Sequence, residues 1–191
     1  MEWCPRCAAL WYMSRLAATC HAAVRRSAQT LGLMLSFNLQ GQRFQVRAAA
    51  VVFDGGHVLL HRAPGDDFWS LPGGRVEVGE EASATVTREM KEELGVDVTC
   101  GELLHLAENF FDLHGRRNHE IGLYFLAYLP AECSFLAKAH SHFGIEKHRG
   151  LEFRWFATKE LGSIDLRPTF LQASLVSGTP RFSHVVQREY P

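Results

Sequence analysis

The stretch GRVEVGEEASATVTREMKEELGV, residues 74–96, decides the interpretation of this 191-residue chain. Its second half, residues 82–94, contains neither Pro nor Gly and predicts an α-helix. Glu80 and Glu81 precede that helix, where negative charge favours a helix N-terminus, and Gly95 follows it as a terminating residue. The segment therefore predicts a loop that leads into one acidic helix.

Three glutamates of this helix, Glu89, Glu92 and Glu93, are spaced at i, i+3 and i+4. This spacing places their carboxylates on one helix face, where they repel one another unless cations lie beside them. Oxygen ligands without His or Cys favour Mg²⁺ or Mn²⁺ over zinc. Taken alone, the three glutamates also fit an ordinary solvated helix face.

The residues around the helix favour a ligand site over a solvated face. Gly73 and Gly74 let the backbone approach a ligand closely, and Pro72 fixes the entry to their turn. Arg88 follows Glu80 by eight residues and can pair with it, which would hold the loop to the helix. The sequence therefore predicts a cation site at this loop and helix.

The same stretch matches the Nudix box, Gly-x5-Glu-x7-Arg-Glu-U-x-Glu-Glu-x-Gly-U, in which U is a bulky aliphatic residue. Every fixed position is present between Gly74 and Val96. The flanking segments 69–74, 151–156 and 167–171 also resemble the family. The chain thus resembles a MutT-like Nudix hydrolase over about residues 43–176.

The resemblance implies a fold and an activity. The fold is an α/β/α sandwich with a mixed β-sheet. The activity is hydrolysis, dependent on Mg²⁺ or Mn²⁺, of a nucleoside diphosphate linked to another group X, as in a nucleoside triphosphate or a nucleotide sugar. The alternative is a non-catalytic Nudix module that binds a nucleotide or a protein partner. The complete box favours the enzyme, a pyrophosphohydrolase, and subfamily marks that would select one substrate are absent.

The resemblance also implies roles for single residues. Metal ligands would be Glu89, Glu92, Glu93 and a backbone carbonyl at Gly73 or Gly74, while Arg88 and Glu80 would be mainly architectural. The expected catalytic residues are Glu92, Glu93, Glu120 and Arg88, and the expected substrate-binding residues are Arg62, Gly73 and Gly74.

An acid outside the box is expected as a further ligand or base. Glu120 is preferred, Glu146 is the second candidate and Glu152 the third. Arg62 can contact a phosphate or simply lie on the surface. Trp69 can stack on a base, although a position in the core is favoured.

The remaining elements follow from composition. Residues 44–53 and 57–62 flank an Asp-Gly turn and predict a β-hairpin. Residues 96–111 and 121–129 predict a long antiparallel pair joined by the polar stretch 112–120, and residues 151–157 predict another strand. Pro168 opens a last helix that is expected to reach about Ser177 and to close at Gly178.

The overall charge, −1 with 47% apolar residues, argues against nucleic acid as a partner. No apolar stretch is long enough for a membrane span. The expected partner is a small nucleoside diphosphate derivative, and the family resemblance leaves a homodimer open. The five scattered cysteines favour a reducing compartment.

The N-terminal part differs from the rest, since residues 1–53 carry one acid and six arginines. Residues 1–33 resemble an amphipathic targeting segment, but an extension outside a Nudix domain at 34–191 is favoured. The expected location is therefore cytoplasmic unless that segment is a signal. Cys4 and Cys7 have the spacing of half a zinc site, without a second pair.

Overall fold

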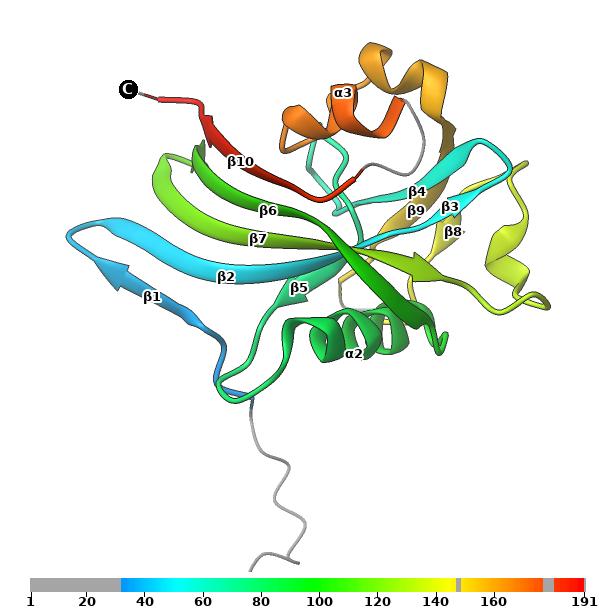
Figure 1. Ribbon diagram of the computed structural model, residues 1–191, viewed down its shortest axis with the longest axis horizontal. Coiled ribbons are helices and arrows are strands. Elements are labelled where there is room, and N and C mark those ends of the chain that lie inside the picture. Colours follow the sequence, from blue (N-terminus) through cyan, green and yellow to red (C-terminus); the bar gives the residue numbers. More distant parts are fainter. Residues whose placement is uncertain (1–31, 147–148, 177–180, 191) are drawn as a thin grey trace, which may run out of the picture. The chain divides into compact units, whose positions relative to one another are not determined.

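The computed structural model describes residues 32–146, 149–176 and 181–190 (Figure 1). The Cys4–Cys7 pair, Gly178 and nearly all of the predicted N-terminal extension lie outside these ranges. Within the described part of the chain, no helix combines the length and hydropathy that a membrane crossing requires.

The larger sheet has six strands in the order β1-β2-β7-β6-β10, with β5 added alongside β2. It is mixed, because β2 runs parallel to β7 and β10 runs parallel to β6, while the other pairs are antiparallel. The strands are β1 (Ser36–Leu39), β2 (Gln42–Val51), β5 (Gly73–Arg75), β6 (Thr99–Leu113), β7 (Arg116–Tyr128) and β10 (Ser183–Arg188).

The smaller sheet has four strands in the order β3-β4-β9-β8, all antiparallel. Its strands are β3 (Phe53–Asp54), β4 (His57–Arg62), β8 (His142–Phe143) and β9 (Glu152–Ala157). The described helices are α2 (Ala82–Leu94), α3 (Phe170–Val176) and the short 3-10 helices η1 (Ser134–Leu136) and η2 (Thr158–Ser163).

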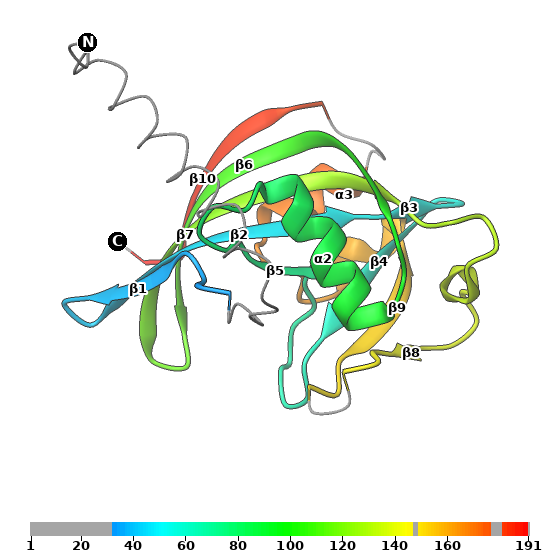
Figure 2. The ribbon, with the colours of Figure 1, turned by 90° about the horizontal axis from the view of Figure 1, so that it is seen from below.

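Helices cover both sides of the sheets, as Figures 1 and 2 show. On one side α2 contributes Val86, Met90 and Leu94 to one apolar core. On the other side α3 and η2 contribute Leu171 and Leu161 to a second core. The α/β/α sandwich expected from the sequence is therefore confirmed.

The predicted hairpin of 44–53 with 57–62 is wrong in its extent. Phe53 and Asp54 pair with β4, and the Val52 carbonyl accepts a hydrogen bond from the Leu59 amide at 3.0 Å, whereas β2 ends at Val51 and belongs to the larger sheet. The reason lies in residues 48–52, which are all at most 1% exposed. A strand covered on both faces is typical of a sheet centre rather than of an isolated hairpin.

Other boundaries need smaller corrections. The helix 82–94 is confirmed to the residue, and Gly95 closes it with a φ of 72°. The antiparallel pair of β6 and β7 is also confirmed, but most of the stretch 112–120 is strand, and the turn is confined to His114 and Gly115. Strand β10 is not predicted from the sequence, because its residues Ser-His-Val-Val-Gln-Arg do not alternate between polar and apolar, although the positions alternate between half-buried and exposed.

Candidate functional site

An ion pair between Glu80 and Arg88, called here the Glu80–Arg88 brace, joins the loop to helix α2, as the spacing predicts. Arg88 Nε and Nη2 donate to the two Glu80 carboxylate oxygens at 2.8 and 3.0 Å. Thr85 Oγ1 and the Glu77 amide donate to Glu80 as well. Arg88 also donates to the carbonyl of Arg75, at the end of β5. One guanidinium thus fixes loop, strand and helix together.

The two glycines before the helix occupy positions with no room for a side chain. A Cβ on Gly74 would overlap the Glu89 carboxylate, and a Cβ on Gly73 would overlap the Ala48 carbonyl. Gly73 also has a φ of 141°, which other residues rarely adopt. The glycines therefore let β5 lie against both β2 and the acidic face of α2.

The three box glutamates differ in exposure. Glu89 is 4% exposed and Glu93 is fully buried. The Glu92 side chain is 47% exposed and accepts a hydrogen bond from Arg88 Nη1 at 3.1 Å. Arg88 Nη1 also donates to Glu89 at 2.8 Å. The predicted acidic face is present, and Arg88 compensates part of its charge.

Arg149 brings a second cation to these acids. Its Nη1 lies 3.1 Å from Glu93 Oε1, 3.1 Å from Glu146 Oε2 and 3.9 Å from Glu89 Oε2. On the other side of Glu93, His61 Nδ1 lies 3.6 Å from Oε2. Neither contact with Glu93 has hydrogen-bond geometry, so both of its buried carboxylate oxygens lack a hydrogen-bond partner among residues 32–146, 149–176 and 181–190.

The electrostatics of this cluster follow from its burial. Desolvation raises the pKa of the Glu89 carboxyl, and the hydrogen bond from Arg88 opposes this only in part. Desolvation also lowers the pKa of His61, which favours the neutral imidazole beside Glu93. A buried site with carboxylates that burial destabilises gains strongly from an added cation.

The residues present fit a divalent cation in donor chemistry. Buried carboxylate oxygens normally have a partner, and a hard cation would satisfy those of Glu93 and Glu89. Within the described ranges, no three His, Cys, Asp or Glu side chains already form a ligand set. Arg88 and Arg149 lie among the glutamates instead.

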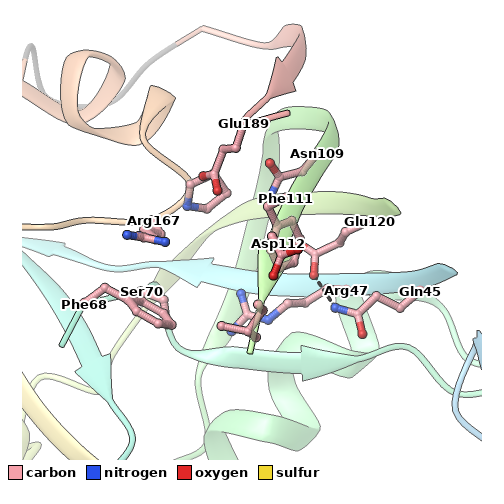
Figure 3. Close-up of a pocket in the computed structure, with 12 residues that line it drawn as sticks. Gln45, Arg47, Phe68, Ser70, Asn109, Phe111, Asp112, Glu120, Arg167 and Glu189 are labelled. Carbon is pink, nitrogen blue, oxygen red and sulfur yellow. Dashed lines mark hydrogen bonds between the residues drawn. The ribbon is translucent and has the colours of Figure 1, made fainter. Parts of the chain in front are cut away.

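Two neighbouring cavities open beside these residues. The larger, of about 610 Å³, is lined by Gly73, Gly74, Glu89, His61 and Arg149, among others. The smaller, of about 180 Å³, is shown in Figure 3. Gln45, Arg47, Ser70 and Leu113 line both cavities and connect them.

Glu120 lies in the smaller cavity, apart from the box glutamates. It is 5% exposed and accepts a hydrogen bond from Gln45 Nε2 at 2.6 Å (Figure 3). Asn109 lies opposite it on β6, and its buried Oδ1 has no hydrogen-bond partner in the described part of the chain. Phe68 and Phe111 add aromatic walls to this cavity. Glu146, in contrast, is linked to the box through Arg149.

Arg62 and Glu152 are engaged with each other. Arg62 Nη2 donates to Glu152 Oε2 at 2.7 Å, and the guanidinium carbon lies 4.5 Å from the centre of the Trp69 ring. Ser141 donates to the other Glu152 oxygen at 2.7 Å. Trp69 is 7% exposed, so the favoured core position of this tryptophan is confirmed.

His61, Arg149 and Arg47 were missed as site residues by the sequence interpretation. Arg47 Nη2 donates to the carbonyls of Leu71 and Gly73 at 2.9 and 3.1 Å and so holds the glycine turn. These residues come from β4, from the segment before β9 and from β2, and no local spacing connects them to the box. Only the fold brings them there.

Comparisons with known proteins agree with this geometry. A family model described as NUDIX domain matches residues 43–174. The CTP pyrophosphohydrolase of Escherichia coli (strain K12) is 33% identical over 75 residues, which are 37% of this chain and 54% of that relative. The chain therefore matches only about half the length of that curated relative.

Solved structures show the same fold. The MutT protein from Bacillus halodurans superposes with a TM-score of 0.56 at 21% identity, covering 76% of this chain and 91% of that one. An ADP-ribose pyrophosphatase from Streptococcus suis 89-1591 gives a TM-score of 0.50 at 20% identity, covering 75% and 98%. The match to the family model covers more than half of the chain, and the chain therefore belongs to the NUDIX family.

Proposed function

We propose that this protein is a divalent-cation-dependent hydrolase that cleaves the diphosphate linkage of a small nucleoside diphosphate derivative. The observation that carries the proposal is Glu93, a fully buried carboxylate that has no hydrogen-bond partner among the described residues and whose neighbours His61 and Arg149 line the larger cavity. The named relatives act on a nucleoside triphosphate and on ADP-ribose, and both substrates contain a diphosphate linkage.

In this proposal Glu89, Glu92, Glu93 and the Gly74 carbonyl hold Mg²⁺ or Mn²⁺. Arg88 keeps the glutamates in place through Glu80. When bound, such an ion neutralises phosphate charge and lowers the pKa of a bound water. The buried surroundings strengthen these effects, because water screens them less.

The substrate would span both cavities. The nucleoside would occupy the smaller cavity, where Phe68 and Phe111 can stack on a base and the Asn109 amide can hydrogen-bond to its edge. The diphosphate would lie in the larger cavity beside Gly74 and Glu89. Arg47 lines both cavities and suits the phosphate between them.

Glu120 is the preferred general base of this proposal. Its carboxylate is held by the neutral amide of Gln45, a residue that lines both cavities, so Glu120 would act at their junction, toward the diphosphate, with lone pairs available for a proton. Glu146 Oε2 already accepts a hydrogen bond from Arg149 Nη1 at 3.1 Å, so this carboxylate is less free to take a proton from water. Arg62, which is already paired with Glu152, is the weaker candidate for a phosphate contact.

A screen of nucleotides, dinucleotides and nucleotide sugars with Mg²⁺ tests the proposal by the release of phosphate or pyrophosphate. Glu93→Gln and Glu120→Gln should each reduce turnover of the best substrate by about 100-fold or more. Glu81→Gln is the matched control, since Glu81 is exposed and its side chain makes no capping hydrogen bond.

The outcomes separate the alternatives. If Glu146→Gln reduced turnover more than Glu120→Gln did, Glu146 and not Glu120 would be the general base. Tight nucleotide binding without any product from a broad panel would support the non-catalytic module and contradict the enzyme.

A further inference from the structure

Four arginines lie close together at the larger cavity, three in its lining and Arg116 beside them. Arg43 and Arg47 lie on β2, and Arg75 on β5 is the direct cross-strand partner of Arg47. All three line the larger cavity. Arg116 begins β7 and reaches back to Asn38, whose Oδ1 lies 3.5 Å from its Nη1, and Asn38 in turn pairs with Arg43. We call these four residues the arginine cluster.

No residue of the arginine cluster forms an ion pair with a carboxylate within the described ranges, although Asp66 and Glu89 line the same cavity. In those ranges, the arginines that form ion pairs with carboxylates are Arg62, Arg88, Arg149 and Arg167, and none of these belongs to the cluster. The pKa of Arg43 is lowered, first by desolvation and then by the charges of Arg116 and Arg75. Positive charges held close together create a positive potential in the cavity, and this potential attracts an anionic ligand.

The position of the arginine cluster indicates which part of a substrate it would contact. Arg43 and Arg75 line the larger cavity but not the smaller one. If the nucleoside occupies the smaller cavity and the diphosphate lies beside Gly74, these two arginines face the part of the substrate beyond the diphosphate. Arg47 differs from them, because it lines both cavities and also holds the glycine turn.

We infer that Arg43 and Arg75, supported by Arg116, bind a phosphate group beyond the scissile diphosphate, so that the group X of the substrate is anionic. This inference rests on the proposed function. A terminal phosphate of a nucleoside triphosphate and an internal phosphate of a dinucleoside polyphosphate both supply that charge, whereas the neutral sugar of a nucleotide sugar does not. The protein therefore selects phosphate-extended nucleotides over sugar-linked ones.

Binding measured without turnover tests the inference. Titration calorimetry with Ca²⁺ in place of Mg²⁺ would compare ATP, diadenosine tetraphosphate and ADP-ribose, which share the ADP part, and then the corresponding guanine compounds. The wild-type protein should bind at least one phosphate-extended ligand about ten-fold or more tightly than the sugar-linked one. The two extended ligands distinguish a terminal from an internal phosphate.

The double variant Arg43→Gln/Arg75→Gln should lose this preference while its affinity for the sugar-linked ligand changes by less than about two-fold. Arg154→Gln is the matched control, because Arg154 is an exposed arginine of β9 that packs over Phe156. Equal affinities in the wild-type protein, or a preference that survives in the double variant, would overturn the inference.

Hydrolysis of the same compounds with Mg²⁺ is a separate measurement. Failure of the wild-type protein to cleave any of them would contradict the proposed function, while the binding preference would still decide the role of Arg43 and Arg75. Thermal melting of each variant shows whether the fold is intact. A double variant that melts like the wild-type protein yet keeps its preference counts against the arginine cluster.

Discussion

Glu93 is the residue whose environment differs most from what a carboxylate ordinarily requires. In the part of the chain that the structure describes, its buried oxygens have no hydrogen bond, and the Arg149 guanidinium 3.1 Å away only partly replaces the charge that a metal ion would supply. Glu93→Gln should therefore weaken Mn²⁺ binding about ten-fold or more, and leave the melting temperature in EDTA unchanged or higher. Electron paramagnetic resonance of Mn²⁺ and calorimetric melting measure the two effects. A strongly lowered melting temperature in EDTA would show that Glu93 is structural.

Removal of Arg149 should have the opposite effect on Mn²⁺ binding at the same site. Its guanidinium lies near Glu89 and Glu93, two carboxylates that the metal ion of the proposal would also use, so the two cations compete. Arg149→Gln should tighten Mn²⁺ binding by about ten-fold and lower the melting temperature in EDTA. Lys91→Gln serves as a control, because Lys91 is exposed and its ion pair among the described residues is with Asp97, not with a box glutamate. Weaker Mn²⁺ binding in Arg149→Gln would contradict the competition.

For single residues, the sequence predicts only contacts between residues that are near one another along the chain. The spacing of Glu89, Glu92 and Glu93 follows from helix geometry alone, and the Glu80–Arg88 brace follows from a loop of fixed length. His61 and Arg149 carry no comparable signal, since each reaches Glu93 from another part of the chain.

Among the elements, the loop before α2 depends on the ionised form of Glu80. The pKa of Glu80 falls from 4.5 to about 2, first because of the hydrogen bond from Arg88. The stabilisation is present above pH 4.5 and is lost as the pH falls toward about 2. Glu80→Gln should therefore cost about 2 kcal/mol of unfolding free energy at neutral pH and progressively less in acid.

Urea unfolding at neutral pH and near pH 3 measures this difference, with Glu81→Gln as the exposed control. A cost for Glu80→Gln that does not change with pH would show that shape, and not charge, holds the loop.

The strands show why element boundaries were harder to predict than the helix. Helix α2 has a clear terminator in Gly95, whereas β6 and β7 continue through polar residues because each strand pairs with the other almost to the turn. Likewise β2 passes from one sheet toward the next at Val51 without a Gly or Pro to mark the change. Pairing partners, not local composition, set these limits.

Across the whole molecule, β10 joins parts that are distant in sequence. It pairs with β6, Gln187 accepts a hydrogen bond from the first amide of α3 at 2.9 Å, and Tyr190 donates to the Asn118 carbonyl at 3.2 Å. Removal of residues 181–191 should therefore lower the melting temperature by roughly 10 °C and expose the edge of β6. Differential scanning calorimetry measures the shift.

Removal of residues 1–32 is the contrasting change. Leu33 already belongs to the domain, since its carbonyl accepts a hydrogen bond from the Val78 amide at 2.7 Å. The shortened chain should keep its melting temperature within about 2 °C and its turnover with the best substrate. An insoluble or inactive product would show that the N-terminal segment is part of the domain.

The position of the residues that follow β10 also affects how this protein should be tagged for purification and binding experiments. Glu189 lines the smaller cavity, so an affinity tag fused to the C-terminus would begin close to the proposed nucleoside site. Such a tag should be cleaved before affinities are compared. The same placement is useful for detection, because an environment-sensitive fluorophore attached near residue 190 would report cavity occupancy without altering the acidic helix.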